Sequence, residues 1–110
     1  MVTVVVSSLS ANMFEYQYKF CLPVHKIREE SEFRAFAKDE GVISYIGDED
    51  TNSFLMEYFR EFEVVQDSEY QYNPADTVVV VSPKHRASKV KVEKFEDLSV
   101  MIVYPARYEC

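Results

Sequence analysis

The alternation of apolar and polar residues along this chain predicts its helices and strands before any chemistry is considered. In residues 51–65 the apolar side chains recur at intervals of three and four, which places them on one face of an α-helix. The residues on that face are Phe54, Leu55, Tyr58, Phe59, Phe62 and Val65. The opposite face is mainly acidic. The pattern therefore predicts an amphipathic helix that follows the acidic loop 48–50 and has Thr51 or Asn52 as its N-cap.

The remaining apolar segments have the features of β-strands. Residues 2–9 are almost continuously apolar and β-branched, which is typical of a strand buried on both faces. Residues 14–22 alternate strictly between apolar and polar, and we expect them to form an antiparallel hairpin with the first strand. Shorter strands are predicted at 42–46, 77–81, 89–92 and 100–104, with 77–81 in the centre of the sheet.

A second helix is predicted to begin within residues 28–31, where neighbouring glutamates favour the positive end of its dipole. Its core contacts are expected to be Phe33, Phe36 and Ala37. Gly41 follows at the position of a helix C-cap, where glycine adopts the left-handed conformation without strain.

Together these elements predict one α+β domain over residues 1–110. It should contain an antiparallel or mixed β-sheet of about five to six strands with two α-helices packed on one face. A chain of 110 residues is long enough for one hydrophobic core. Its apolar content of 47% indicates that it folds despite a net charge of −7.

The charge is distributed unevenly along the chain. Residues 29–76 contain fourteen acidic and three basic side chains, whereas the remainder contains five acidic and nine basic ones. The molecule is therefore predicted to have a strongly acidic middle segment and a mildly basic C-terminal third. Such a field attracts a basic partner and repels nucleic acid over the acidic side.

The cysteines and the first residues bear on the compartment. Cys21 and Cys110 are far apart in sequence and form neither a disulfide framework nor a zinc motif, so a structural thiol is expected at Cys21. Residues 1–9 lack the basic segment of a signal peptide, and no run approaches the roughly 18 apolar residues of a membrane span. We therefore expect a soluble cytoplasmic protein that does not contact a membrane.

Motifs for common reactions are absent from the sequence. With two glycines, Gly41 and Gly47, the chain cannot supply a dinucleotide-binding loop, a Walker A loop or a nucleophile elbow. His25 and His85 lie beside basic residues, and we interpret both as solvent-exposed histidines. No catalytic residue and no cofactor is predicted, and the protein is expected not to be an enzyme.

One short segment partly matches a calcium-binding loop. Asp48, Asp50 and Asn52 occupy its first three ligand positions. The sixth position, which requires glycine, is Ser53, and the twelfth, which requires a bidentate glutamate, is Phe59. We therefore expect a solvated loop at the start of a helix and predict no metal site.

Two alternative functions remain open at this stage. The first is a small metal-dependent nuclease, or another enzyme, built on scattered carboxylates together with Lys84 or Lys91. The second is a nucleic-acid-binding protein that uses a basic hairpin at residues 84–94. The basic residues of that hairpin are Lys84, His85, Arg86, Lys89, Lys91 and Lys94.

The acidic cluster is poorly explained by stability alone. Glu57 and Glu61 are four positions apart on the predicted helix, and a like-charge pair at that spacing destabilises a helix slightly. Carboxylates on such a surface can imitate nucleic-acid phosphates and occupy a basic groove. Tyrosines outside the periodic segments are expected to be exposed contact residues. The predicted partner-binding residues are Asp48, Glu49, Asp50, Glu57, Glu61, Tyr70 and Tyr72.

In size and charge the chain is similar to small phage and viral inhibitors, including DNA mimics and anti-CRISPR proteins. The sequence-based hypothesis is therefore a non-enzymatic inhibitor, encoded by a virus, that binds a basic nucleic-acid-handling protein in the host cytoplasm through an acidic helix and loop. Association should be electrostatically steered and sensitive to salt. A homodimer through an exposed edge strand is a further open alternative.

Overall fold

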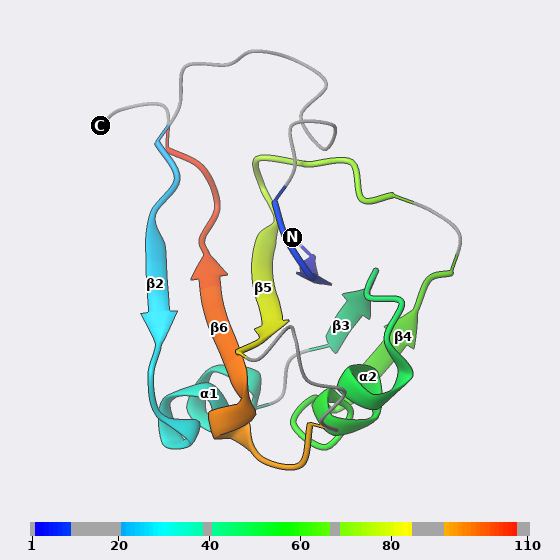
Figure 1. Ribbon diagram of the computed structural model, residues 1–110. Coiled ribbons are helices and arrows are strands. Elements are labelled where there is room, and N and C mark those ends of the chain that lie inside the picture. The colour runs from blue at the N-terminus through cyan, green and yellow to red at the C-terminus, as the bar shows by residue number, and fades with distance from the viewer. Residues whose placement is uncertain (1, 10–20, 39–40, 67–68, 85–91, 108–110) are drawn as a thin grey trace.

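The computed structural model describes residues 2–9, 21–38, 41–66, 69–84 and 92–107. It shows a six-stranded mixed sheet with the order β2-β6-β5-β1-β3-β4 (Figure 1). The strands are β1 (Thr3–Val6), β2 (Val24–Ile27), β3 (Gly41–Ser44), β4 (Glu61–Val64), β5 (Thr77–Pro83) and β6 (Leu98–Val103). The helices are α1 (Glu30–Ala37) and α2 (Glu49–Leu55), and a 3₁₀ turn, η2 (Phe95–Asp97), precedes β6. The predicted α+β class is confirmed.

Parallel and antiparallel strands occupy different halves of the sheet. β5, β1, β3 and β4 are parallel neighbours, whereas β6 and β2 pair in the antiparallel sense. α2 connects β3 to its parallel neighbour β4, as a crossover between adjacent parallel strands requires. The carboxyl ends of β3 and β4 therefore lie together beside the start of α2.

β1 lies in the interior of the sheet, and the valines at positions 4–6 are fully buried on alternating faces. It pairs with β3 on one side and β5 on the other. The predicted antiparallel hairpin between residues 2–9 and 14–22 is therefore wrong over Thr3–Val6, because neither edge of that strand is free. Most of the predicted partner strand, residues 14–20, lies outside the described residues.

The sheet packs a different cluster of side chains on each face. On one face Val5, Val79 and Ile102 pack against Phe33 of α1 and Leu55 of α2. Both helices therefore cover the same face, as predicted. On the opposite face the cluster consists of Val4, Val6, Tyr70, Val78 and Val103.

An aromatic group centred on Phe33 joins α1 to the segment after α2. The Phe33 ring lies 5.0 Å from Tyr58, 5.7 Å from Phe59 and 5.7 Å from Phe95, measured between ring centroids. Phe33 and Ala37 are buried as predicted, and Phe36 is half-buried against the same cluster. Tyr58 and Phe59, which the periodicity places on one long helix, instead follow α2 and pack around Phe33 beneath the sheet.

The predicted helix over residues 51–65 is wrong in its second half. α2 begins earlier, at Glu49, and ends at Leu55, and residues 61–64 form the edge strand β4. The sequence Glu61-Phe62-Glu63-Val64 also alternates with the period of a strand. Phe62 packs against the helix-covered face, so Glu61 and Glu63 belong to the opposite one. Pairing with β3 satisfies the backbone groups on the inner side of β4 and favours the strand period over the helical one.

Smaller predictions about the glycine cap and the remaining strands can also be compared with the structure. Gly41 begins β3 and has no left-handed backbone conformation, so the predicted glycine C-cap is wrong. The strand β2 was not predicted from the sequence. The central strand at 77–81 and the last strand at 100–104 are confirmed as β5 and β6, whereas residues 89–91 lie outside the described residues. No helix in the described part of the chain is long and apolar enough to cross a membrane.

Candidate functional site

The region around α2 is organised by a short acidic segment. Asp48 is the N-cap of α2, and its carboxylate accepts hydrogen bonds from the backbone N–H and the hydroxyl of Thr51. Glu49 and Asp50 follow in the first turn, where carboxylates are favoured by the helix dipole. The N-cap therefore lies three residues before Thr51 and four before Asn52, the two predicted positions, and Thr51 serves as donor to the cap instead.

Asn52 connects α2 to the end of β3 inside the protein. Its Oδ1 accepts a hydrogen bond of 2.7 Å from the Ser44 hydroxyl, and its Nδ2 donates one of 2.7 Å to the Ile46 carbonyl. The Ser44 oxygen in turn accepts from the Ile46 N–H at 3.2 Å. All three residues are buried, so this network holds the helix start at a fixed place beside the strand.

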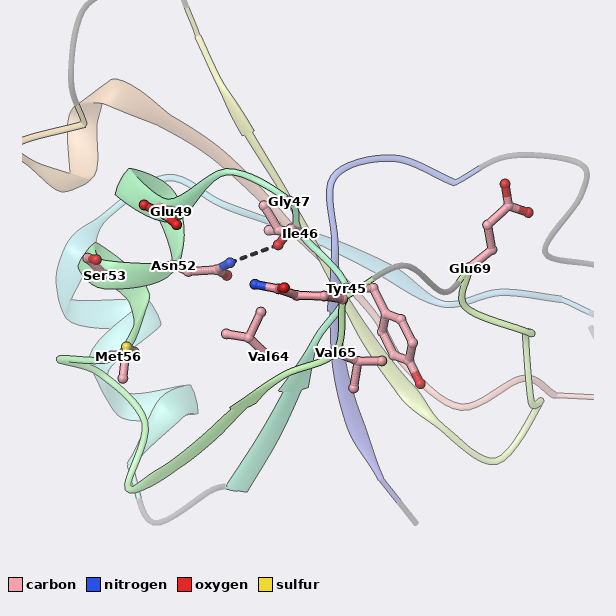
Figure 2. Close-up of a pocket in the computed structure, with 11 residues that line it drawn as sticks. Tyr45, Ile46, Gly47, Glu49, Asn52, Ser53, Met56, Val64, Val65 and Glu69 are labelled. Atoms are coloured by element: carbon pink, nitrogen blue, oxygen red, sulfur yellow. Dashed lines mark hydrogen bonds between the residues drawn. The ribbon is translucent and has the colours of Figure 1, made fainter.

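A cleft of about 740 Å³ lies next to this network, at the carboxyl ends of β3 and β4 (Figure 2). α2 forms one wall, and the segments that leave β3 and β4 form the rest. Its lining residues are Tyr45, Ile46, Gly47, Glu49, Asn52, Ser53, Met56, Val64, Val65, Gln66 and Glu69. Ligands of open sheets commonly bind at the carboxyl ends of parallel strands, which is where this cleft is found.

The cleft is lined by polar and apolar side chains, with an acidic residue toward each end. Figure 2 shows Val64 and Val65 between the α2 wall, which carries Glu49, and the opposite end, where Tyr45 and Glu69 lie. Met56 and Val64 are among the most exposed large apolar side chains of the described residues, at 53% and 37%. The sequence offered no signal for this cleft, because its residues come from three separate segments.

The predicted acidic residues do not lie on one helix face. Asp48, Glu49 and Asp50 gather at the start of α2, whereas Glu57 follows its end. Glu61 lies on β4 and therefore does not form the predicted like-charge pair with Glu57 on a helix. With Glu63 and Ile43 it lines a second hollow of about 460 Å³, at the amino-terminal ends of β1, β3 and β4.

These carboxylates nevertheless share one edge of the molecule. β4 is the edge strand, and α2 lies beside it in Figure 1. We call this the acidic edge; its members are Asp48, Glu49, Asp50, Glu57, Glu61 and Glu63. All six side chains are exposed, and none is ion-paired within the part of the chain that the structure describes. Arg60 is the basic residue of this stretch.

The two tyrosines in the predicted partner site are not exposed contact residues. Tyr70 is 4% exposed and donates a hydrogen bond of 2.7 Å to Asp76, which is itself buried. Burial raises the pKa of the Tyr70 phenol, the N–H of Asn73 opposes this, and the bond to Asp76 raises it further. Tyr72 is half-buried against the same cluster. Both tyrosines therefore belong to the packing of the sheet.

A polar group missed by the sequence analysis links α1 to Tyr58. The Tyr58 hydroxyl donates to the Glu30 carboxylate at 2.7 Å, and Arg34 donates to the same oxygen at 2.7 Å. The hydrogen bond from Tyr58 and that from Arg34 lower the pKa of Glu30, whereas burial raises the pKa of Tyr58. Arg34 also lies 4.7 Å above the Tyr58 ring. This group holds α1 against the segment that follows α2.

His25, the basic hairpin and metal binding can also be compared with the structure. His25 is exposed and pairs with Glu32 at 3.0 Å on the far edge of the sheet. Most of the basic hairpin, residues 85–91, lies outside the described residues. Among the described residues, no group of three His, Cys, Asp or Glu side chains could hold a metal ion.

Cys21 departs from its prediction. It is disulfide-bonded, so the expected structural thiol is wrong; Cys110, the other cysteine of the chain, lies outside the described residues. Its backbone pairs with Arg107, which lies near the other end of the chain, through hydrogen bonds of 2.8 and 2.9 Å. Disulfides are rare in a reducing cytosol, so this bond weighs against the compartment expected from the sequence.

Comparison with known proteins found no family model and no curated protein that matches this sequence.

Proposed function

We propose that this protein is a non-enzymatic interaction protein that binds a basic partner through the acidic edge. The observation that supports the proposal is that this edge carries six exposed carboxylates without ion pairs among the described residues. Like charges gathered without partners give a strong negative potential, which attracts a basic surface and accelerates association.

The arrangement of the carboxylates around the edge strand indicates the class of partner. The carboxylates flank an edge strand on two sides instead of forming one flat face, so they suit a groove that encloses the edge. Proteins that handle nucleic acid have such grooves, lined by lysine and arginine for phosphate contacts. In its specific form the proposal is that the protein, encoded by a virus, occupies such a groove and so inhibits nucleic-acid binding.

Charge reversal on the acidic edge tests this proposal. The test variant carries Glu57→Lys, Glu61→Lys and Glu63→Lys, and leaves the N-cap Asp48 intact. The matched control carries Glu29→Lys, Glu32→Lys and Glu96→Lys, three exposed carboxylates away from the acidic edge. Both variants change the net charge by the same amount, so a difference between them reports position and not total charge.

Each protein is immobilised and exposed to a heparin-binding fraction of a cell lysate at increasing salt. We expect the native protein and the control variant to retain the same basic nucleic-acid-binding protein and the acidic-edge variant to lose it. Elution by moderate salt is expected, because the Debye length falls from about 10 Å at 0.1 M to about 3 Å at 1 M and contacts between exposed charges are then screened. Equal retention by the two variants would contradict the proposal, as would a retained protein whose nucleic-acid binding is unaffected.

A further inference from the structure

The outer side of β4 is a sheet edge with unpaired backbone groups. β4 is the last strand in the sheet order, and within the described part of the chain no strand pairs with its outer side (Figure 1). The Val65 N–H donates to the Ser44 carbonyl of β3 at 2.8 Å, so Val65 directs its backbone inward. Backbone direction alternates along a strand, so the N–H and C=O groups of Phe62 and Val64 point outward. An edge of this kind is a template for another strand.

The side chains of β4 give the two faces of this edge different characters. Phe62 packs in the cluster on the helix-covered face, and Val64, two residues further on, lies on the same face and is 37% exposed. Glu61 and Glu63 lie on the opposite face, and both are exposed without an ion pair among the described residues. A strand that lies along β4 therefore meets apolar side chains on one face and carboxylates on the other.

The carboxylates decide which strand can pair with this edge. A second copy that paired in the antiparallel sense through its own β4 would set Glu61 and Glu63 against the same residues of its partner, and opposing like charges are destabilising. A parallel copy would set these carboxylates beside the apolar side chains of Phe62 and Val64. A strand with lysine or arginine on the carboxylate face sets opposite charges side by side instead.

We infer that β4 binds an extended segment of the basic partner, which joins the sheet as an additional strand. In this segment, lysine or arginine residues that face Glu61 and Glu63 alternate with apolar residues that face Phe62 and Val64. Hydrogen bonds to the backbone of β4 supply affinity, and the alternation of side chains supplies specificity. This inference rests on the proposed function, because it states how the same acidic edge holds its partner.

Hydrogen exchange measured by NMR on the native protein tests the pairing. The probe is acetyl-Lys-Val-Lys-Val-Lys-Val-amide, and the control is acetyl-Lys-Lys-Lys-Val-Val-Val-amide, which has the same composition and charge without the alternation. We expect the alternating peptide to slow exchange of the outward-facing Phe62 and Val64 amides and to leave the amides of β2, the other edge strand, unchanged. Equal slowing by both peptides, or no slowing at Phe62 and Val64, would overturn the inference. Slow exchange at these amides that depends on protein concentration without peptide would indicate a second copy and would also overturn it.

A pair of N-methylated peptides shows whether the bound segment is a strand. Alternate N–H groups of a strand point to opposite sides, so either the lysines or the valines of the probe direct their N–H groups toward β4. One peptide is methylated at the lysine nitrogens and the other at the valine nitrogens. We expect one of the two to lose binding: the lysine-methylated peptide if the added strand is parallel to β4, and the valine-methylated peptide if it is antiparallel. Binding by both, or by neither, would contradict strand addition.

Variants of β4 separate strand pairing from general attraction by charge. Val64→Pro removes an outward N–H at a sheet edge, where proline is tolerated, and should abolish binding of the alternating peptide. Val64→Thr keeps the N–H and should bind it nearly as well as the native protein. Glu61→Gln combined with Glu63→Gln should weaken binding roughly fivefold, because the ion pairs are exposed to solvent. Glu29→Gln combined with Glu96→Gln removes the same charge elsewhere and should weaken it much less. Binding that survives Val64→Pro, or equal loss in the two charge variants, would refute the site.

Failure of this inference is distinguishable from failure of the proposed function. If the acidic-edge variant loses the partner but Val64→Pro retains it, strand addition plays no part and the proposed function stands. If the alternating peptide pairs with β4 but the native protein retains no basic partner, the proposed function fails and β4 remains a strand-binding site.

Discussion

Asn52 shows how one buried amide positions a helix against a sheet. Its two hydrogen bonds reach the Ser44 hydroxyl and the Ile46 carbonyl, which both lie at the end of β3. From the sequence it is either an N-cap or a mimic of a calcium ligand, because asparagine occurs in both places. Its role in holding α2 depends on contacts with the end of β3, and the local sequence pattern does not predict those contacts.

Replacing Asn52 with alanine should destabilise the protein by about 2–3 kcal/mol, because the buried Ser44 and Ile46 groups lose their partner. Urea unfolding followed by circular dichroism measures this loss. The matched control is Ser53→Ala, one residue further along α2 and exposed, which should change stability by less than about 0.5 kcal/mol. Similar values for the two variants would contradict the role of the network.

Tyr70 provides a test with a pH signature. Its phenol donates to the buried Asp76 carboxylate, so Tyr70→Phe should cost about 1–3 kcal/mol at pH 7. Because folding raises the pKa of Tyr70, its contribution is fully present below the unfolded pKa of about 10 and is lost as pH rises through the folded pKa.

The difference in unfolding free energy between native protein and Tyr70→Phe should therefore shrink from pH 8 to pH 11. Guanidinium unfolding at both pH values measures it. Tyr104→Phe is the control, since Tyr104 is 39% exposed and should show a small difference at either pH. A Tyr70 difference that grows with pH would contradict the assigned direction.

At the scale of elements, β4 is the segment where two sequence periods compete. Phe62 fits both a helical repeat and a strand alternation, and the four residues 61–64 are too few for local preference to decide. In the folded protein, parallel pairing of Gly41 with Glu61 and of Ile43 with Glu63 satisfies the backbone groups of β4 that face β3. Whether residues 61–64 form a strand therefore depends on pairing with β3, which is a tertiary interaction.

A pair of substitutions at Glu63 distinguishes strand from helix. Both Glu63→Thr and Glu63→Ala remove the charge, but threonine should be the more stable by about 0.5 kcal/mol in a strand beside Ile43. In a helix the order would be reversed. The same two substitutions at the exposed Ser53 of α2 should favour alanine. Thermal unfolding ranks the four variants, and alanine as the more stable at Glu63 would contradict the strand.

The features that could be predicted from the sequence are those determined by residues close together in the chain. The core strand β5 and the burial of Phe33 were predictable, because a run of valines, or a phenylalanine at a helical spacing, indicates burial from the local sequence alone. The neighbours of β1 were not predictable, since its valines suit any central position. The cleft was also unpredictable, because Tyr45, Asn52 and Val64 meet only through the crossover β3–α2–β4.

At the scale of the whole molecule, residues near both ends of the chain are joined. Cys21 and Arg107 exchange two backbone hydrogen bonds, and β2 pairs with the last strand β6 directly beyond them. The disulfide at Cys21 adds a covalent link to this region. A bond that closes a long stretch of chain stabilises mainly by limiting the unfolded state.

Reduction should therefore lower the free energy of unfolding by about 2–4 kcal/mol. Protein purified without reductant and then unfolded should show no reactive thiol, whereas reduced protein should show both cysteines of the sequence. Urea unfolding with and without reductant measures the stability change, and Cys21→Ser should be insensitive to reductant. Two reactive thiols per chain in the untreated protein would contradict the disulfide and restore the reducing compartment that the sequence alone suggests.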